Sequence, residues 1–181
     1  MEINTEINTE LNTELNTERL FLRTITEADV AIVRDFGKDE FKTDEDALKW
    51  IRWVKDKNEE GRLIVNFYIW LMQTNHCIGR VYIHSKPELN GEVEIGYGIS
   101  EEHRNSGYAT EAAKAVIQFA FESAGQDVLA AIVKPENIAS GRVIEKLGFT
   151  NHGIRTLPDE NGEKCEFDYF QLYRSDWRVL T

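Results

Sequence analysis

The stretch HRNSGYATEAAKAVIQFAFESAG carries the residues of this chain best suited to bind an anion. Arg104 and Gly107 precede a run that predicts a helix from about Ser106 to Ser123. The first turn of a helix has backbone amides without partners and a partial positive charge, which together attract anions. Gly107 leaves room for close approach, and Arg104 adds a forked, permanently charged donor. This opening therefore predicts a site for a diphosphate group.

The pattern around this opening predicts the elements that position it. Three apolar strands precede it, at residues 62–73, 77–85 and 92–100, and polar or Pro- and Gly-containing turns separate them. A strand at 127–135, a short helix at 137–148 and two closing strands follow it. A helical crossover makes the 92–100 and 127–135 strands parallel in an otherwise antiparallel sheet. The helix then begins at the end of the sheet where these two strands part.

The first third of the chain predicts a strand and two helices. The segment RLFLRTI reads as the strand, and TEADVAIVRDF and TDEDALKWIRWVKDKNEE read as the helices. Thr26 and Thr43 stand where each helix needs a cap, and acidic residues follow in each first turn.

Length and charge limit the classes of function. The chain has 181 residues, 41% of them hydrophobic, which suits one domain with one core of ordinary size. A formal charge of −11 argues against nucleic acid as a partner and favours a cationic or neutral substrate. Cys77 and Cys165 cannot build a disulfide framework, and neither a leader pattern nor an apolar run long enough for a bilayer occurs. We expect a cytoplasmic protein without a membrane partner.

The chain begins with a four-residue unit, EINTEINTELNTELNTERL. As a helix it places Ile3, Ile7, Leu11 and Leu15 on one slowly drifting stripe, whereas as a strand it alternates apolar residues and Thr with Asn and Glu. Neither interpretation is strong, because Asn and Thr are weak helix formers and Asn is depleted in strands. A tandem expansion tolerated at a terminus is the favoured hypothesis. Residues 1–16 would then be an extension and residues 17–181 the folded domain.

Several spaced motifs together resemble the GNAT superfamily of acyl-CoA-dependent N-acyltransferases. They are RNSGYATEA, the order of strands before it, and NIASGRVIEKLGF about thirty residues later. The segment TERLFLR resembles the opening of the branch that contains ribosomal-protein N-terminal (alanine/serine) acetyltransferases. The resemblance runs from about Thr17 to Tyr173. It implies an α/β (α+β) fold with a mixed, mostly antiparallel central sheet, a splayed parallel strand pair and flanking helices.

The resemblance implies acetyl-CoA as cosubstrate and no metal. The family's diphosphate loop matches Arg104, Gly107 and Ala109, and the amides that would face the phosphates are those of Asn105, Ser106, Gly107, Tyr108 and Ala109. The main chain of Tyr97, Gly98 and Ile99 would pair with the pantetheine arm. Asn137 would hydrogen-bond the pantetheine, or else simply cap its helix. The branch often has Gly and a basic residue where Asn105 and Ser106 stand, so weaker cofactor binding is expected.

The implied reaction moves an acetyl group to a primary amine, of a protein N-terminus or a small molecule, by direct attack in a ternary complex. A carboxylate near the sheet opening can accept the proton of the amine. Glu92 and Glu94 share one face of a strand, and Glu94 is preferred because it lies closer to the splay. The alternative for Glu94 is a solvated or salt-bridged strand carboxylate, and His84 and His103 are lesser candidates.

The leaving thiolate needs an acid. Many family members carry a tyrosine seven residues after the helix asparagine, but Ile144 stands there in this chain. Ser140, three residues after Asn137, is the candidate that the branch implies. Two other functions remain open: a catalytically silent acyl-CoA-binding or sensing module, and an interaction domain without cofactor. We expect a monomer or a homodimer.

Overall fold

The computed structural model of the protein describes residues 13–37, 40–159 and 162–180. Its strands are β1 (Glu14–Asn16), β2 (Leu20–Thr24), β3 (Ile64–Leu71), β4 (Cys77–Ser85), β5 (Val93–Ile99), β6 (Val128–Val133), β7 (Thr150–Pro158) and β8 (Lys164–Tyr173). Its α-helices are α1 (Val30–Phe36), α2 (Asp44–Glu59), α3 (Tyr108–Glu122), α4 (Ile138–Lys146) and α5 (Arg174–Leu180). Short 3-10 helices occupy Glu27–Asp29, Pro87–Leu89 and Glu101–His103.

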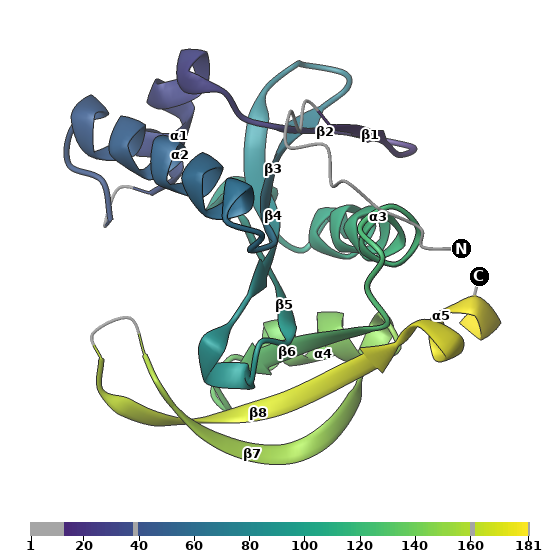
Figure 1. Cartoon of the computed structure of the whole chain (residues 1–181). Helices are drawn as coiled ribbons and strands as arrows, with labels where there is room; N and C mark the ends of the chain where they lie inside the picture. The colour runs from purple at the N-terminus through teal and green to yellow at the C-terminus, as the bar shows by residue number, and fades with distance from the viewer. Residues whose placement is uncertain (1–12, 38–39, 160–161, 181) are drawn as a thin grey trace, which may run out of the picture.

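The strands form one sheet in the order β1-β2-β3-β4-β5-β6-β8-β7 (Figure 1). Every neighbouring pair is antiparallel except β5 and β6, which are parallel and bridge at Glu94 and Ala130 alone. Beyond that bridge the two strands separate. The expected mixed sheet with one splayed parallel pair and flanking helices is therefore confirmed.

Helices cover both faces of the sheet. Alternate residues of β3 show the two layers: Phe67 packs in the larger core with α3, whereas Tyr68 and Trp70 pack in a second core with α1 and α2. Because β3 is buried on both faces, its sequence is a nearly continuous apolar run. Figure 1 shows α1 and α2 on one side of β3 and β4 and α3 on the other. No helix of the described chain is long and apolar enough to cross a membrane.

Both predicted threonine caps are present. Thr26 accepts a hydrogen bond from the amide of Ala28 and forms a capping box with Asp29, and Thr43 forms one with Asp46. The first predicted helix differs in one respect, because its first turn is the 3-10 helix Glu27–Asp29 and the α-helix begins at Val30.

The last repeat unit of the N-terminal segment forms the edge strand β1. It pairs antiparallel with β2, and Leu15 packs against the larger core. The amide of Thr13 donates to the Thr24 hydroxyl at 3.2 Å. Residues 1–12 lie outside the described residues. The boundary proposed between residues 16 and 17 falls at the β1–β2 turn, so Glu14–Asn16 contribute to the sheet.

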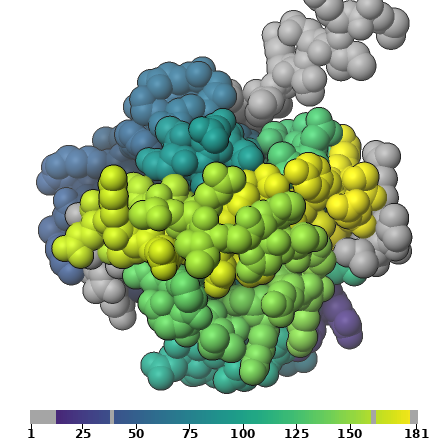
Figure 2. Space-filling view, turned by 90° about the horizontal axis from the view of Figure 1, so that it is seen from below, coloured from purple at the N-terminus to yellow at the C-terminus, as the bar shows by residue number. Residues whose placement is uncertain are grey.

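The opposite edge of the sheet is β7. Its side chains are exposed along nearly the whole strand, and it lies across the lower face of the molecule beside β8 (Figure 2). Arg155 on β7 places its guanidinium 4.5 Å from the ring centroid of Tyr169 on β8, which helps hold the two strands together.

Candidate active site

The loop before α3 presents unpaired backbone amides. Asn105 and Gly107 both have left-handed backbones, with φ of 60° and 81°, and Gly107 is the N-cap of α3 without a side-chain cap. The helix therefore begins at Tyr108, two residues after the predicted start. Among the described residues, the amides of 105–109 donate no hydrogen bond. The loop geometry suits an anion at this helix end.

Arg104 lies between this loop and the end of β5. Its Nε donates to the carbonyl of Ile99 at 3.1 Å, and its amide donates to the carbonyl of Glu101. The guanidinium is exposed and forms no ion pair within the described part of the chain. Its remaining donors are therefore available to a phosphate.

Arg19 was missed by the sequence analysis and lies against the same loop. Its guanidinium pairs with Glu111 at 2.6 Å, donates to the carbonyl of Ser106 at 3.0 Å and lies 4.5 Å from the ring centroid of Tyr108. Thr17 also donates to Glu111, at 2.6 Å. These contacts tie the start of β2 to the first turn of α3. The signal was present in the sequence, since Arg19 belongs to TERLFLR and Glu111 to GYATEA.

The carboxyl group of Glu111 is held in its ionised form. Burial alone would raise its pKa, but the hydrogen bonds from Thr17 and from the amide and guanidinium of Arg19 lower it overall. The Glu111 carboxylate therefore stays charged at neutral pH, and its partner Arg19 holds the loop through the carbonyl of Ser106.

Two residues of β5 direct their main-chain hydrogen-bonding groups toward the gap where β5 and β6 separate. The amide of Ser100 donates to Ile78 on β4, and main-chain groups alternate in direction along a strand. The main-chain N–H and C=O groups of Gly98 therefore point toward β4. Those of Tyr97 and Ile99 point toward β6, from which β5 has separated. Of the three residues expected to pair with pantetheine, Tyr97 and Ile99 have the suitable direction, and the Ile99 carbonyl already accepts the bond from Arg104.

Tyr97, Ser140 and Asn137 form a hydrogen-bonded chain between β5 and α4. The Tyr97 hydroxyl lies 3.1 Å from both Oγ and the carbonyl oxygen of Ser140. Asn137 caps α4, because its Oδ1 accepts from the amide of Ser140 at 3.2 Å. Burial raises the pKa of Tyr97 and keeps its phenol protonated, although the Ser140 contact opposes this shift. The sequence analysis did not predict that the hydroxyl of Tyr97 would contact α4.

Glu94 is buried at the point where β5 and β6 last pair. Its side chain is 7% exposed, and Oε2 lies 3.1 Å from Nζ of Lys86. Burial raises the pKa of Glu94, and the nearby Lys86 ammonium partly offsets that rise. Glu92, the second candidate, is instead held by Tyr169 and by Gln171 on β8. Of the two carboxylates, Glu94 is the one beside the splay.

Glu94, the candidate base, and Tyr97, which contacts the candidate acid Ser140, lie on opposite faces of the sheet. Glu94 and Tyr97 are three residues apart on one strand, so their side chains point to opposite sides. Tyr97 faces α4, and Glu94 faces the side that α1 and α2 cover. An amine and a departing thiol could therefore meet their partners from different directions.

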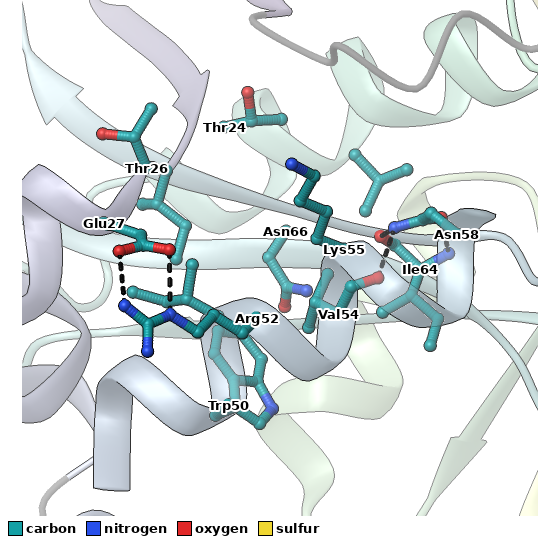
Figure 3. Close-up of a pocket in the computed structure, with 13 residues that line it drawn as sticks. Thr24, Thr26, Glu27, Trp50, Arg52, Val54, Lys55, Asn58, Ile64 and Asn66 are labelled. Carbon is teal, nitrogen blue, oxygen red and sulfur yellow. Dashed lines mark hydrogen bonds and ion pairs between the residues drawn. The ribbon is translucent and has the colours of Figure 1, made fainter. Parts of the chain in front are cut away.

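A pocket of about 440 Å³ opens on the Glu94 face, between α2 and the strands β2 and β3 (Figure 3). Asn66 forms part of its lining, and the Oδ1 atom of this 5% exposed residue has no hydrogen-bond partner among the described residues. Nδ2 of Asn66 lies 3.1 Å from Nε2 of His84, which is directly opposite Glu94 in the β4–β5 register. Burial lowers the pKa of His84 to about 3, so its ring is neutral. The polar side chains of Asn66, His84 and Glu94 thus lie on neighbouring strands, from the pocket to the candidate base.

A mixed sheet that parts beside an open helix start, with polar side chains on both faces of the opening, is the arrangement expected of an acyl-CoA-dependent N-acyltransferase. The model of the acetyltransferase (GNAT) domain matches residues 19–150. The chain therefore belongs to the GNAT family and is an acetyl-CoA-dependent N-acetyltransferase. The described residues contain no cluster of side chains that could hold a metal ion.

Similar proteins agree with this family. The N-acetyltransferase YoaA of Bacillus subtilis (strain 168) is 28% identical over 167 residues, covering 86% of this chain and 94% of its own. A GNAT-family acetyltransferase from Bacillus anthracis has a TM-score of 0.69 at 26% identity, covering 90% of this chain and 99% of that one. The ribosomal-protein-S5-alanine acetyltransferase from Vibrio fischeri has the same fold, with a TM-score of 0.77 at 18% identity over 91% of this chain and 98% of that one.

Proposed function

We propose that the protein transfers the acetyl group of acetyl-CoA to a primary amine by direct attack in a ternary complex. The observation that carries the proposal is the uncapped start of α3, with its unpaired amides, beside the β5–β6 splay. The diphosphate of acetyl-CoA needs such hydrogen-bond donors, and its thioester needs the gap between the strands.

Acetyl-CoA would be held along one line of main-chain groups. The amides of 105–109 and the Arg104 guanidinium bind the diphosphate, with Arg19 fixing the loop beneath. Tyr97 and Ile99 offer their main chain to the pantetheine arm. Asn137 has its Oδ1 committed to the helix cap, so its contribution is the Nδ2 donor, which forms no hydrogen bond among the described residues.

The chemistry divides between the two faces of the sheet. Glu94 accepts the proton that the attacking amine loses, because its raised pKa makes it a stronger base than an ordinary carboxylate. A main-chain amide of β5 next to the splay stabilises the negative charge that develops on the thioester oxygen. Ser140 gives a proton to the departing thiolate, and the hydroxyl of Tyr97 supports it at 3.1 Å.

The acceptor reaches Glu94 from the side of α1 and α2. The pocket beside α2 offers the Asn66 oxygen as a hydrogen-bond acceptor and the exposed Lys55 at its edge (Figure 3). A volume of about 440 Å³ suits a small molecule or the first residues of a peptide. The proposed acceptor is therefore either a small amine or a protein N-terminus.

Two measurements test this proposal. Calorimetric titration with acetyl-CoA should show one site, whereas an interaction domain without cofactor would give no heat. Thiol release should then be followed with a panel of amines that contains amino acids, polyamines and peptides beginning with Ala or Ser. Release that depends on the amine supports the transferase, and binding without release in every case would favour the silent module.

A further inference from the structure

The ammonium group of Lys86 occupies a position that an acceptor amine needs. Its Nζ lies 3.1 Å from Oε2 of Glu94, the candidate base. The carboxylate is buried, with 7% of its side chain exposed, whereas the lysine side chain is 37% exposed. Lys86 is therefore a primary amine that enters the site from the solvent side and ends at the base.

The backbone holds Lys86 in this place. Its amide donates to the carbonyl of Glu92 at 2.9 Å, and its own carbonyl accepts from the amides of Leu89 and Gly91 at 3.0 and 2.9 Å. Pro87 follows and restricts the chain further. The β4–β5 turn is thus closed by three hydrogen bonds around Lys86, so that its side chain projects along β5 toward Glu94.

Other lysine ion pairs of the protein differ from this one. Lys49 pairs with Glu45 and Lys57 with Glu60, but those carboxylates are 75% and 57% exposed and lie on or beside α2. In these two pairs the carboxylate stays in water. The Lys86 pair alone, among the ion pairs of the described residues, joins an amine to the buried carboxylate at the β5–β6 opening.

We propose that Lys86 is an internal acceptor, so that the protein acetylates its own Lys86 side chain. The inference rests on the proposed function, because it needs Glu94 to lie beside the thioester. Nζ of Lys86 gives a proton to Glu94 and then forms a bond to the acetyl carbonyl carbon. The carbon–sulfur bond breaks, the nitrogen releases its second proton, and the departing thiolate takes up one proton and leaves as coenzyme A. The product is one amide on Lys86, and the reaction ends after one acetyl group per chain.

The test follows acetylation of the full-length chain with acetyl-CoA by mass spectrometry. Trypsin does not cut the Lys86–Pro87 bond, so residues 81–104 form one tryptic peptide that carries Lys86 in both its free and its acetylated form. Occupancy at Lys86 is compared over time with that at Lys49, which reports uncatalysed chemical acetylation. We expect Lys86 to react roughly 10²-fold faster than Lys49, in line with a positioned base. Equal rates at the two lysines would overturn the proposal.

Variants separate the proposed step from background chemistry. Glu94→Gln should slow acetylation of Lys86 toward the Lys49 rate and leave Lys49 unchanged. The matched control Glu45→Gln removes the carboxylate partner of Lys49. It should change neither the acetylation rate of Lys86 nor the folding of the protein. Should Lys86 react equally fast in Glu94→Gln, Glu94 would not direct the reaction, and the inference would be wrong.

A third readout distinguishes this inference from the proposed function. Lys86→Arg keeps the charge beside Glu94 but cannot be acetylated at that position. Acetyl-CoA binding and amine-dependent thiol release are measured in this variant and in the parent. Thiol release with external amines, together with an unmodified Lys86 in the parent, would refute self-acetylation and leave the proposed function standing. Absence of acetyl-CoA binding would instead refute the proposed function.

Discussion

The hydroxyl of Tyr97 on β5 lies 3.1 Å from Oγ of Ser140 on α4. This contact spans the sheet opening, and the phenol beside α4 comes from the strand β5 and not from the helix itself. The helix position where many relatives carry tyrosine holds Ile144, which is 1% exposed and packs in the larger core. We therefore propose that Ser140 of the helix and Tyr97 of the strand act together as the acid.

The first prediction concerns this pair. Ser140→Ala should lower turnover roughly 10²-fold, because the direct proton donor is lost. Tyr97→Phe should have a smaller effect in the same direction, since water can replace its hydroxyl. Both variants should keep acetyl-CoA affinity, measured by calorimetry beside steady-state kinetics. Tyr173→Phe, an exposed tyrosine, is the control, and loss of turnover there would void the comparison.

The second prediction concerns the diphosphate loop. Arg104→Ala should weaken acetyl-CoA binding by about 1.5 to 3 kcal/mol, the contribution of a charge-assisted hydrogen bond. Gly107→Val should weaken it further, because valine is strained at a φ of 81° and its side chain would obstruct the approach of the diphosphate to the loop amides. Calorimetric titration measures both. Parental affinity in both variants would show that the diphosphate binds elsewhere.

A matched glycine controls for backbone strain. Gly61 also has a left-handed backbone, with φ of 85°, and a Cβ there would meet nothing within 4 Å. Gly61→Val should therefore destabilise the fold as Gly107→Val does, by roughly 1 to 2 kcal/mol of backbone strain in thermal unfolding, and keep the affinity for acetyl-CoA. A drop in affinity at Gly61→Val would mean that strain alone explains the loop variant.

Local patterns predicted much of the fold. The threonine caps, the apolar strands and the crossover helix each rest on spacing within about twenty residues, and the structure has all of them. The left-handed tolerance of Asn105 also follows from its residue type, and its φ is 60°. The parallel β5–β6 pair followed from the helical crossover that connects the two strands, which needs no distant contact to predict.

Contacts between distant segments could not be predicted in the same way. Arg19 and Glu111 are 92 residues apart, and Tyr97 and Ser140 are 43 apart. Each pair is made by packing of whole elements, so neither residue alone signals its partner. The strand β1 was also ambiguous, because its Asn and Thr favour no regular structure. In the structure the segment is a strand, because it pairs with β2 and the partly buried Leu15 packs against the larger core.

The third prediction concerns the N-terminal segment. Deleting residues 2–12 should leave the thermal midpoint and acetyl-CoA affinity nearly unchanged, if the earlier units are a tolerated expansion. Deleting residues 2–16 should lower stability by roughly 1 to 3 kcal/mol, because Leu15 and the β1–β2 bonds are lost. Thermal unfolding of both variants measures the difference. Equal stability would show that β1 contributes nothing.

The fourth prediction concerns His84. Its pKa is lowered by burial to about 3, against about 6.5 in an unfolded chain, so the unfolded state binds an extra proton between these values. Stability should therefore be full above pH 6.5 and fall as the pH drops toward 3. His84 contributes at most about 1.4 kcal/mol per pH unit to the slope of the free energy of unfolding against pH. Denaturant unfolding of His84→Gln against the parent should show a shallower acid slope.

The last prediction concerns Glu94 as base. Burial raises its pKa, so the carboxylate form that accepts a proton predominates only above that raised value. Turnover should therefore rise with pH through the pKa of Glu94. Glu94→Gln should keep acetyl-CoA affinity but lower turnover by roughly 10² to 10⁴ at neutral pH. Part of the loss should return at higher pH, where more of the amine is already neutral.

Two further variants make this interpretation specific. Lys86→Ala removes the ammonium that lowers the pKa of Glu94, so the acid limb of the pH–rate profile should move to higher pH. Glu92→Gln changes the other carboxylate, which Tyr169 and Gln171 hold on β8, and should leave the profile in place. If Glu92→Gln lowered turnover and Glu94→Gln did not, the base would be Glu92. If neither did, Glu94 would be a structural carboxylate whose burial is supported by Lys86.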